Sequence, residues 1–252
     1  MKGLEGKIAI VTGGGKGIGR AIAERFMEEK LAGIGILEWD YELAQNTAKE
    51  LDPTGEIVIP VKCNIADRDN VAEAVKEVAD KFGRIDILVN NAGITKDKIF
   101  HKMEDKMWDD VIAVNLTGAY NMCKAVFGYM REQESGAIVN ISSTSAWGNV
   151  GQANYCATKA GLLGLTKTLA MEGGRKGIRV NTVCPAHVMT DMLRTVPEEK
   201  RQHWLDNYIA LHRFGEPSEI ASVVAFLSSD EASWVTGQEI VAGGTLFTVT
   251  GV

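Results

Sequence analysis

The sequence has little of what marks secreted, membrane-spanning and nucleic-acid-binding proteins. Its four cysteines are scattered without the spacing of metal ligands, so we expect reduced thiols in an intracellular protein. The formal net charge is -6 and there is no run of basic residues, which argues against a nucleic-acid or anionic-membrane surface. Charges and glycines interrupt the first residues, MKGLEGKIAIVTGG, so we expect no signal peptide and a cytoplasmic location.

The sequence also lacks a long apolar run. The stretch 135–158 carries no charge, but its Ser, Asn and Gly content excludes a membrane span. A chain of 252 residues fits one large α/β domain better than two small ones, and such a domain buries roughly three quarters of the unfolded chain's surface. We therefore expect a single catalytic domain over residues 1–252.

Short apolar runs rich in β-branched residues alternate with helical patterns along the whole chain. This alternation predicts a doubly wound, Rossmann-like α/β fold, with a parallel seven-stranded sheet, flanking helices and right-handed crossovers. We expect strands at 7–12, 33–37, 57–63, 85–89, 138–141, 178–184 and 238–241. We expect helices at 71–82, capped by Asp67, at 104–131, and at 217–227, capped by Ser218.

A glycine turn, GGGKGIG at 13–19, follows the first strand directly and runs into a helical pattern. Glycines let the backbone approach a pyrophosphate closely, and the helix N-terminus favours its negative charge. A plain tight turn is the alternative. The pattern predicts a dinucleotide site with contacts from Gly13, Gly15, Lys16, Gly17, Ile18 and Gly19.

The residue that ends the second strand bears on the choice of dinucleotide. Glu38 would accept hydrogen bonds from an adenosine ribose diol and repel a 2′-phosphate, which favours NAD(H). Lys16 could neutralise that phosphate, so NADP(H) stays possible. Residues just past other strand ends should complete the site, because open α/β sheets bind ligands at that edge. These residues are Asn64, which could bond an adenine edge, Ile65, Asn90, Ala92, Gly93, Pro185 and Val188.

The stretch 138–159 carries the predicted chemistry. Tyr155 and Lys159 lie four residues apart at the start of a helical pattern, so both should share one helix face. A neighbouring ammonium favours the phenolate, which predicts a lowered pKa for Tyr155 and a proton donor or acceptor near neutral pH. Ser142, from the strand end, could hold a substrate oxygen there. Tyr-x-x-x-Lys also occurs by chance on exposed helix faces.

Three further predictions concern single segments. Asn115 lies among apolar neighbours, where its amide could serve a neighbouring loop or the reaction. The Met-, Trp- and His-rich segment 191–213 is a plausible part of a substrate lid at about 188–213. His187, His203 and His212 are irregularly spaced and no acid cluster joins them, so we predict no metal site.

Taken in order, these motifs resemble the short-chain dehydrogenase/reductase family over nearly the whole chain. Thr12-Gly13-x-x-x-Gly17-x-Gly19 is similar to its cofactor motif, and Asn90-Asn91-Ala92-Gly93 to its NNAG motif. The resemblance implies hydride transfer between NAD(P)H and a ketone or secondary alcohol. It also implies a catalytic tetrad at Asn115, Ser142, Tyr155 and Lys159, in which Asn115 holds a water and both Tyr155 and Lys159 also contact the cofactor.

Several segments, among them NNAGITKDKIFHKM and GQANYCATKAGLLG, look most like 3-oxoacyl-(acyl-carrier-protein) reductases and acetoacetyl-CoA reductases. This resemblance implies reduction of a 3-oxoacyl thioester on a carrier protein or CoA. The alternatives are an NAD-dependent dehydrogenase of a sugar, steroid or hydroxyacid, and a non-catalytic nucleotide-binding sensor. Members of the family are commonly homotetramers, in which the apolar tail 246–249 would be buried.

Overall fold

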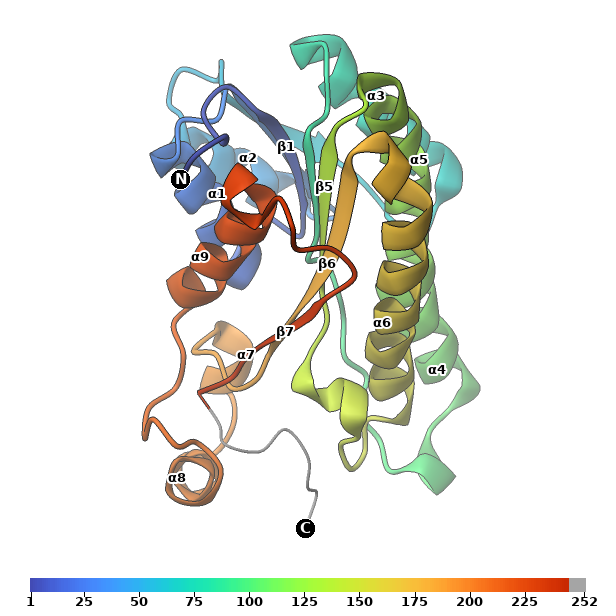
Figure 1. Ribbon diagram of the computed structural model, residues 1–252. Coiled ribbons are helices and arrows are strands. Elements are labelled where there is room, and N and C mark those ends of the chain that lie inside the picture. The colour runs from blue at the N-terminus through green and yellow to red at the C-terminus, as the bar shows by residue number, and fades with distance from the viewer. Residues whose placement is uncertain (245–252) are drawn as a thin grey trace.

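The computed structural model describes residues 1–244 of the chain, apart from the side chain of residue 192. A parallel seven-stranded sheet in the order β3-β2-β1-β4-β5-β6-β7 runs through the molecule (Figure 1). The predicted doubly wound fold is therefore confirmed. The strands are β1 Ile8–Thr12, β2 Gly33–Glu38, β3 Val58–Lys62, β4 Ile87–Asn90, β5 Gly136–Ile141, β6 Ile178–Pro185 and β7 Glu239–Ala242. The predicted role of 246–249 in an oligomer lies outside the described residues.

Helices cover both faces of the sheet, as Figure 1 shows. The helices are α1 Gly17–Glu28, α2 Tyr41–Leu51, α3 Arg68–Phe82, α4 Asp105–Ile112, α5 Ala119–Gln133, α6 Ala153–Gly173, α7 Asp191–Arg194, α8 Glu198–Asn207 and α9 Pro217–Ser228. Short turns of 3₁₀-helix lie at η1 Phe100–Lys102, η3 Thr144–Trp147, η4 Gly174–Lys176 and η5 Asp230–Ala232, and η2 Ala113–Gly118 is π-helical.

Two hydrophobic layers hold these helices to the sheet. Alternate strand residues point to opposite faces, so Val11 and Val139 pack with α1, α2 and α9, whereas Ile10 and Ile138 pack with α3, α5 and α6. Every residue of β1 is buried. Because both faces are covered, the strands read as continuous apolar runs, which is the pattern that made them recognisable in the sequence.

The expected long helix at 104–131 is present as an uninterrupted helical stretch over 105–133, but its middle is not α-helical. It is divided into α4, the π-helical turn η2 and α5. Within η2 the amide of Asn115 bonds the backbone of Ile94 on a neighbouring loop. Such π-helical turns occur frequently at functional sites, and periodicity alone does not reveal them because the apolar stripe continues through the turn.

One predicted helix cap is confirmed and another is wrong. The side chain of Asp67 accepts hydrogen bonds from the first turn of α3, as expected. Helix α9 is instead capped by Glu216, which forms a reciprocal capping box with Glu219, and Pro217 occupies the first helical position. Ser218 lies inside the helix.

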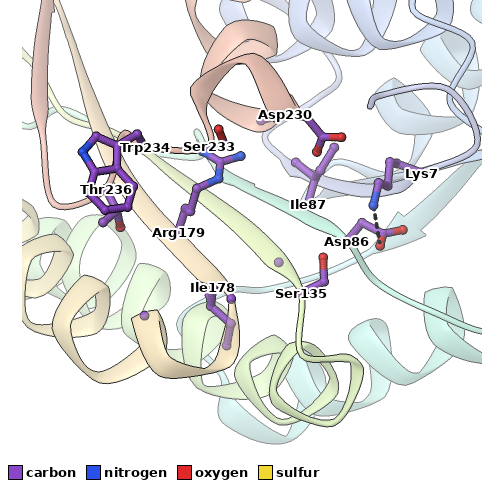
Figure 2. A pocket seen from close by; sticks show the side chains of 14 residues that line it. Lys7, Asp86, Ile87, Ser135, Ile178, Arg179, Asp230, Ser233, Trp234 and Thr236 are labelled. Atoms are coloured by element: carbon purple, nitrogen blue, oxygen red, sulfur yellow. Dashed lines mark ion pairs between the residues drawn. The ribbon is translucent and has the colours of Figure 1, made fainter. Parts of the chain in front are cut away.

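A cavity and the predicted site residues lie at opposite ends of the strands. At the amino ends of the strands lies a cavity of about 510 Å³ (Figure 2). Arg179 in its wall donates to the carbonyls of Leu227 and Ser229 at 2.6 and 3.0 Å, and so caps the C-terminal end of α9. The Arg179 side chain in this cavity is therefore used to hold α9 in place. The predicted site residues lie at the opposite edge, at the carboxyl ends of the strands, where ligands of doubly wound folds bind.

Candidate active site

Tyr155 and Lys159 meet at the start of α6, as their spacing predicts. The Lys159 Nζ lies 5.3 Å from the centre of the Tyr155 ring. It donates a hydrogen bond of 2.8 Å to the carbonyl oxygen of Ile141, the last residue of β5. Lys159 is only 3% exposed. This one contact therefore ties the first turns of α6 to the carboxyl end of a central strand.

The predicted lowering of the Tyr155 pKa is wrong, because burial outweighs the attraction of the phenolate to Lys159. Burial raises the pKa of Tyr155 to about 12, and a hydrogen bond with the Ser143 side chain offsets only part of that rise. Burial also lowers the pKa of Lys159 to about 8. The sequence argument counted the attraction between ammonium and phenolate but not the desolvation of both groups, which dominates here. Tyr155 is consequently a neutral phenol at pH 7, able to donate a proton.

Two consecutive serines follow β5, and the predicted one does not face Tyr155. The Ser142 hydroxyl is 3% exposed and donates at 2.8 Å to the backbone carbonyl of Lys159. Ser143 continues the extended backbone, so its side chain points to the other face. It is Ser143 whose hydroxyl pairs with the Tyr155 phenol, while also accepting from the amide of Ser145 at 3.1 Å. The structure therefore places Ser143, and not Ser142, at the phenol.

The Asn115 amide serves a neighbouring loop, which was one of the two alternatives. Its Oδ1 accepts from the Ile94 amide at 2.8 Å, and its Nδ2 donates to the Ile94 carbonyl at 2.9 Å. Gly93 lies directly beside this contact, because a Cβ on it would be 3.3 Å from the Asn115 Oδ1 and 3.7 Å from the Lys159 Nζ. Asn115 thus fixes the loop after β4 against Lys159.

The predicted cofactor residue Asn90 has its side chain in the core. Its Nδ2 donates to the Asn140 Oδ1 at 2.9 Å and approaches the Cys123 Sγ at 3.2 Å, and the residue is 5% exposed. Asn91, which the sequence analysis did not single out, holds the loop instead. Its Nδ2 donates to the backbone carbonyls of Thr12 and Gly13. The doubled Asn in the motif was the available signal, but spacing did not tell which of the two amides faces the glycine turn.

The glycine turn fits a dinucleotide pyrophosphate. Gly13 and Gly17 have φ of 63° and 56°, a region that L side chains rarely adopt. A Cβ on Gly13 would lie 2.9 Å from the Cα of Ala92, and one on Gly19 would lie 2.1 Å from the Gly13 carbonyl oxygen. Helix α1 begins without a side-chain cap and without an acid in its first turn. Its first amides and the positive end of its dipole are therefore available to phosphate oxygens.

The two residues that bear on the adenosine end lie beside this turn. The Glu38 carboxylate accepts from the Gly15 amide at 3.4 Å and from the Trp39 amide at 3.1 Å. Lys16 is exposed. Asn64 uses its Oδ1 to accept from the Ala66 amide at 3.2 Å, which leaves its amide nitrogen for a ligand. The structure thus brings a carboxylate to the glycine turn, next to an exposed ammonium.

The segment after β6 contacts the glycine turn. Val188 pairs with Gly215, and Thr190 lies against the glycine turn, because a Cβ on Gly17 would be 3.7 Å from the Thr190 Cγ2. The predicted lid at about 188–213 consists of α7, α8 and their connections. Closure over a substrate stays a prediction.

A doubly wound sheet, a glycine turn at a helix start and a Tyr–Lys pair one helical turn apart together define the short-chain dehydrogenase/reductase family, and the chain belongs to it. A family model described as enoyl-(acyl-carrier-protein) reductase matches residues 13–245. The resemblance predicted from the sequence is confirmed, and the protein is an oxidoreductase of the class that uses a nicotinamide dinucleotide.

Curated relatives cover almost the whole chain. A 3-oxoacyl-(acyl-carrier-protein) reductase of Thermotoga maritima is 45% identical over 246 residues, 96% of this chain and 98% of that protein. An acetoacetyl-CoA reductase of Shinella zoogloeoides is 44% identical over 244 residues, 96% and 99% of the two chains. The crystal structure of levodione reductase matches with a TM-score of 0.90 at 32% identity, over 95% of this chain and 97% of that one.

Over 1–244, no helix combines the length and apolar character that crossing a membrane requires. The same part of the chain contains no group of three or more His, Cys, Asp or Glu side chains arranged to hold a metal ion.

The buried ammonium predicts a pH-dependent stability difference. Lys159 has a pKa of about 8 in the folded protein and of 10.5 when unperturbed, so below pH 8 the native state carries a charge that burial disfavours. Between pH 8 and 10.5 the native state loses this proton before the unfolded state does. We expect the free energy of unfolding of the wild type to rise over this range by on the order of 3 kcal/mol relative to Lys159→Met.

Chemical denaturation at a series of pH values measures this difference, and other titrating groups cancel in it. Lys124→Met is the matched control, because this lysine lies exposed on α5. Its difference from the wild type should stay flat. If the difference between the wild type and Lys159→Met does not change with pH, burial does not disfavour the charged form of Lys159.

Proposed function

We propose that the protein reduces 3-oxoacyl thioesters, carried by an acyl-carrier protein or by CoA, to 3-hydroxyacyl thioesters with NADH. The observation that carries the proposal is the neutral Tyr155 phenol, held between the Ser143 hydroxyl and the buried Lys159 at the edge of the sheet that also bears the glycine turn. The substrate class is supported by the names of relatives that are 44–45% identical over 96% of this chain.

In this reaction the chain's residues handle the proton. A nicotinamide dinucleotide, when bound, supplies the hydride to the ketone carbon. Tyr155 donates its phenolic proton to the oxygen as negative charge develops there, so that one hydride and one proton convert the ketone to an alcohol. Lys159, next to the ring, favours the phenolate that remains. The two residues thereby lower the barrier to proton transfer without a free hydronium ion.

Ser143 takes the oxygen-holding role that spacing assigned to Ser142. Its hydroxyl already pairs with the Tyr155 phenol, so a substrate oxygen that hydrogen-bonds Tyr155 also comes within its reach. Ser142 supports the site indirectly, by bonding the Lys159 backbone. Asn115 contributes through the loop at Ile94.

Removing the proton donor should slow the reaction selectively. Tyr155→Phe keeps the ring beside Lys159 but lacks the hydroxyl. We expect kcat/KM for acetoacetyl-CoA to fall by about 10²–10⁴-fold. NADH binding, followed by its fluorescence, should change little. Turnover close to the wild type would remove Tyr155 from the mechanism.

The two adjacent serines give a matched pair of variants. We expect Ser143→Ala to lower kcat by about 10²-fold, because a donor to the developing oxyanion is lost, and Ser143→Thr to restore part of the rate. Ser142→Ala should affect mainly thermal stability, since its bond is to the Lys159 backbone. Steady-state kinetics with circular dichroism as a folding check decides the matter. A larger loss of kcat in Ser142→Ala would return the role to Ser142.

Glu38 supports NADH as the reductant, because its carboxylate accepts from the Gly15 amide of the glycine turn and would repel a 2′-phosphate bound beside it. We expect the wild type to have a lower KM for NADH than for NADPH. Glu38→Gln should lower the ratio of the KM for NADPH to the KM for NADH by about tenfold. Lys16→Gln is the control of opposite sign and should raise the KM for NADPH alone. If neither substitution changes the KM for NADH or NADPH, these two residues do not contact the position of the 2′-phosphate.

A second candidate function is an NAD-linked dehydrogenase of another secondary alcohol. Glu38 and the likeness to levodione reductase favour it. A panel of acetoacetyl-CoA, a cyclic diketone, a steroid ketone and a sugar ketone, each with NADH, separates the two. The thioester proposal requires the highest kcat/KM for acetoacetyl-CoA.

A further inference from the structure

The segment after β6 contains two buried polar side-chain atoms that have no hydrogen-bond partner among the residues that the structure describes. Four such side-chain atoms occur in the described part of the chain: Asn90 Oδ1, Asn121 Oδ1, His187 Nδ1 and Arg201 Nε. The two asparagines lie in the core and their amide nitrogens are bonded. His187 and Arg201 belong instead to the segment after β6. Buried polar groups in native proteins are nearly always paired, so this pair requires an explanation.

Helix α8 has one face turned toward the body of the protein. Of its ten residues, those that are partly buried are Arg201, Trp204 and Leu205, and the others are exposed. Residues three and four apart share a helix face, so these three side chains form a single stripe that begins with Arg201. Trp204 shows what the stripe faces, because its ring lies 4.6 Å from that of His187.

His187 lies at the edge of the sheet that carries the site. It follows Pro185, the last residue of β6, and the neighbouring strand β5 ends at Ile141, which holds Lys159. The Gly215 amide donates to the His187 carbonyl at 3.0 Å and fixes the backbone there. In Figure 1, α7 and α8 lie beyond the carboxyl end of β6. Helix α8 and the Tyr155–Lys159 pair therefore lie at the same, carboxyl, end of the sheet.

The charge on this face is uncompensated. Arg201 forms no ion pair and no side-chain hydrogen bond with any residue that the structure describes. A guanidinium is charged at all accessible pH values, so its partial burial is unfavourable without an anion. The neutral His187 ring adds a group that can donate one hydrogen bond beside it.

We propose that Arg201, with His187, binds an anionic oxygen group of the substrate under α8. Such a group is either the phosphate of a thioester carrier or the carboxylate of a keto acid, since a guanidinium binds both through paired hydrogen bonds. This inference rests on the proposed reduction of a ketone and adds that the preferred substrates are anionic.

Kinetics on substrates that differ only in their anion test this inference. The wild type, Arg201→Gln and Arg201→Lys are compared on acetoacetyl-CoA, on the acetoacetyl thioester of N-acetylcysteamine, which has no phosphate, on acetoacetate and on its neutral ethyl ester. We expect Arg201→Gln to raise KM at least tenfold for acetoacetyl-CoA, for acetoacetate or for both, with kcat kept. KM for the neutral partner should change less than twofold, and Arg201→Lys should fall between. The two pairs distinguish a phosphate from a carboxylate.

Two further variants provide controls. Lys200→Gln removes a charge from the exposed side of α8 and should leave all KM values within twofold, although its Nζ lies 5.3 Å from the Trp204 ring. His187→Phe keeps an aromatic ring against Trp204 but removes the polar atoms, and should raise KM for the same anionic substrate only. Equal effects of Arg201→Gln on anionic and neutral substrates, or no effect, would overturn the inference. Failure of the wild type to reduce either thioester would instead refute the proposed function.

Discussion

The hydrogen bond from the Lys159 ammonium to the Ile141 carbonyl is the contact on which the site depends. It joins α6 to the carboxyl end of β5, and the Ser142 hydroxyl fastens the backbone of the same lysine. With Lys159 held at both ends, Tyr155 one turn earlier is fixed toward Ser143. Burying an ammonium with a single carbonyl partner is unfavourable, which is why its pKa falls to about 8. The packing of the surrounding core must offset that cost.

The same burial gives the two ionisable groups complementary properties. A phenol with a raised pKa stays protonated and so can act as an acid, whereas a lysine with a lowered pKa can exchange a proton near neutral pH. The pKa values of both groups are therefore set mainly by desolvation, and not by the attraction between ammonium and phenolate that the sequence suggested. Asn115 maintains this environment, since its amide pins the loop that places Gly93 beside the lysine.

Much of the fold could be predicted because its signals are local. Apolar runs such as that of β1, the glycine turn at 13–19 and the Asp67 cap each depend on neighbouring residues, and the structure has them where the pattern placed them. What the sequence did not give depends on distant contacts. The choice between Ser142 and Ser143, and between Asn90 and Asn91, is decided by which face of an extended segment meets α6 or the glycine turn. The sign of the pKa change at Tyr155 depends on burial, which spacing does not report.

Polar groups at the two ends of the strands differ in whether they are hydrogen-bonded within the chain. At the amino edge the buried charges are satisfied within the chain: Arg179 bonds two carbonyls of α9, and Asp86 is paired with Arg84. At the carboxyl edge several polar groups can still form hydrogen bonds to a ligand. They are the uncapped start of α1, the Tyr155 phenol and Arg201, whose Nε has no partner among the residues that the structure describes. A stable fold has no need of such groups, because each is less favourable than a satisfied one. Their concentration at one edge is explained if a ligand completes them, and their chemistry agrees with the proposals above: phosphate at α1, a carbonyl oxygen at Tyr155 and a second anion at Arg201.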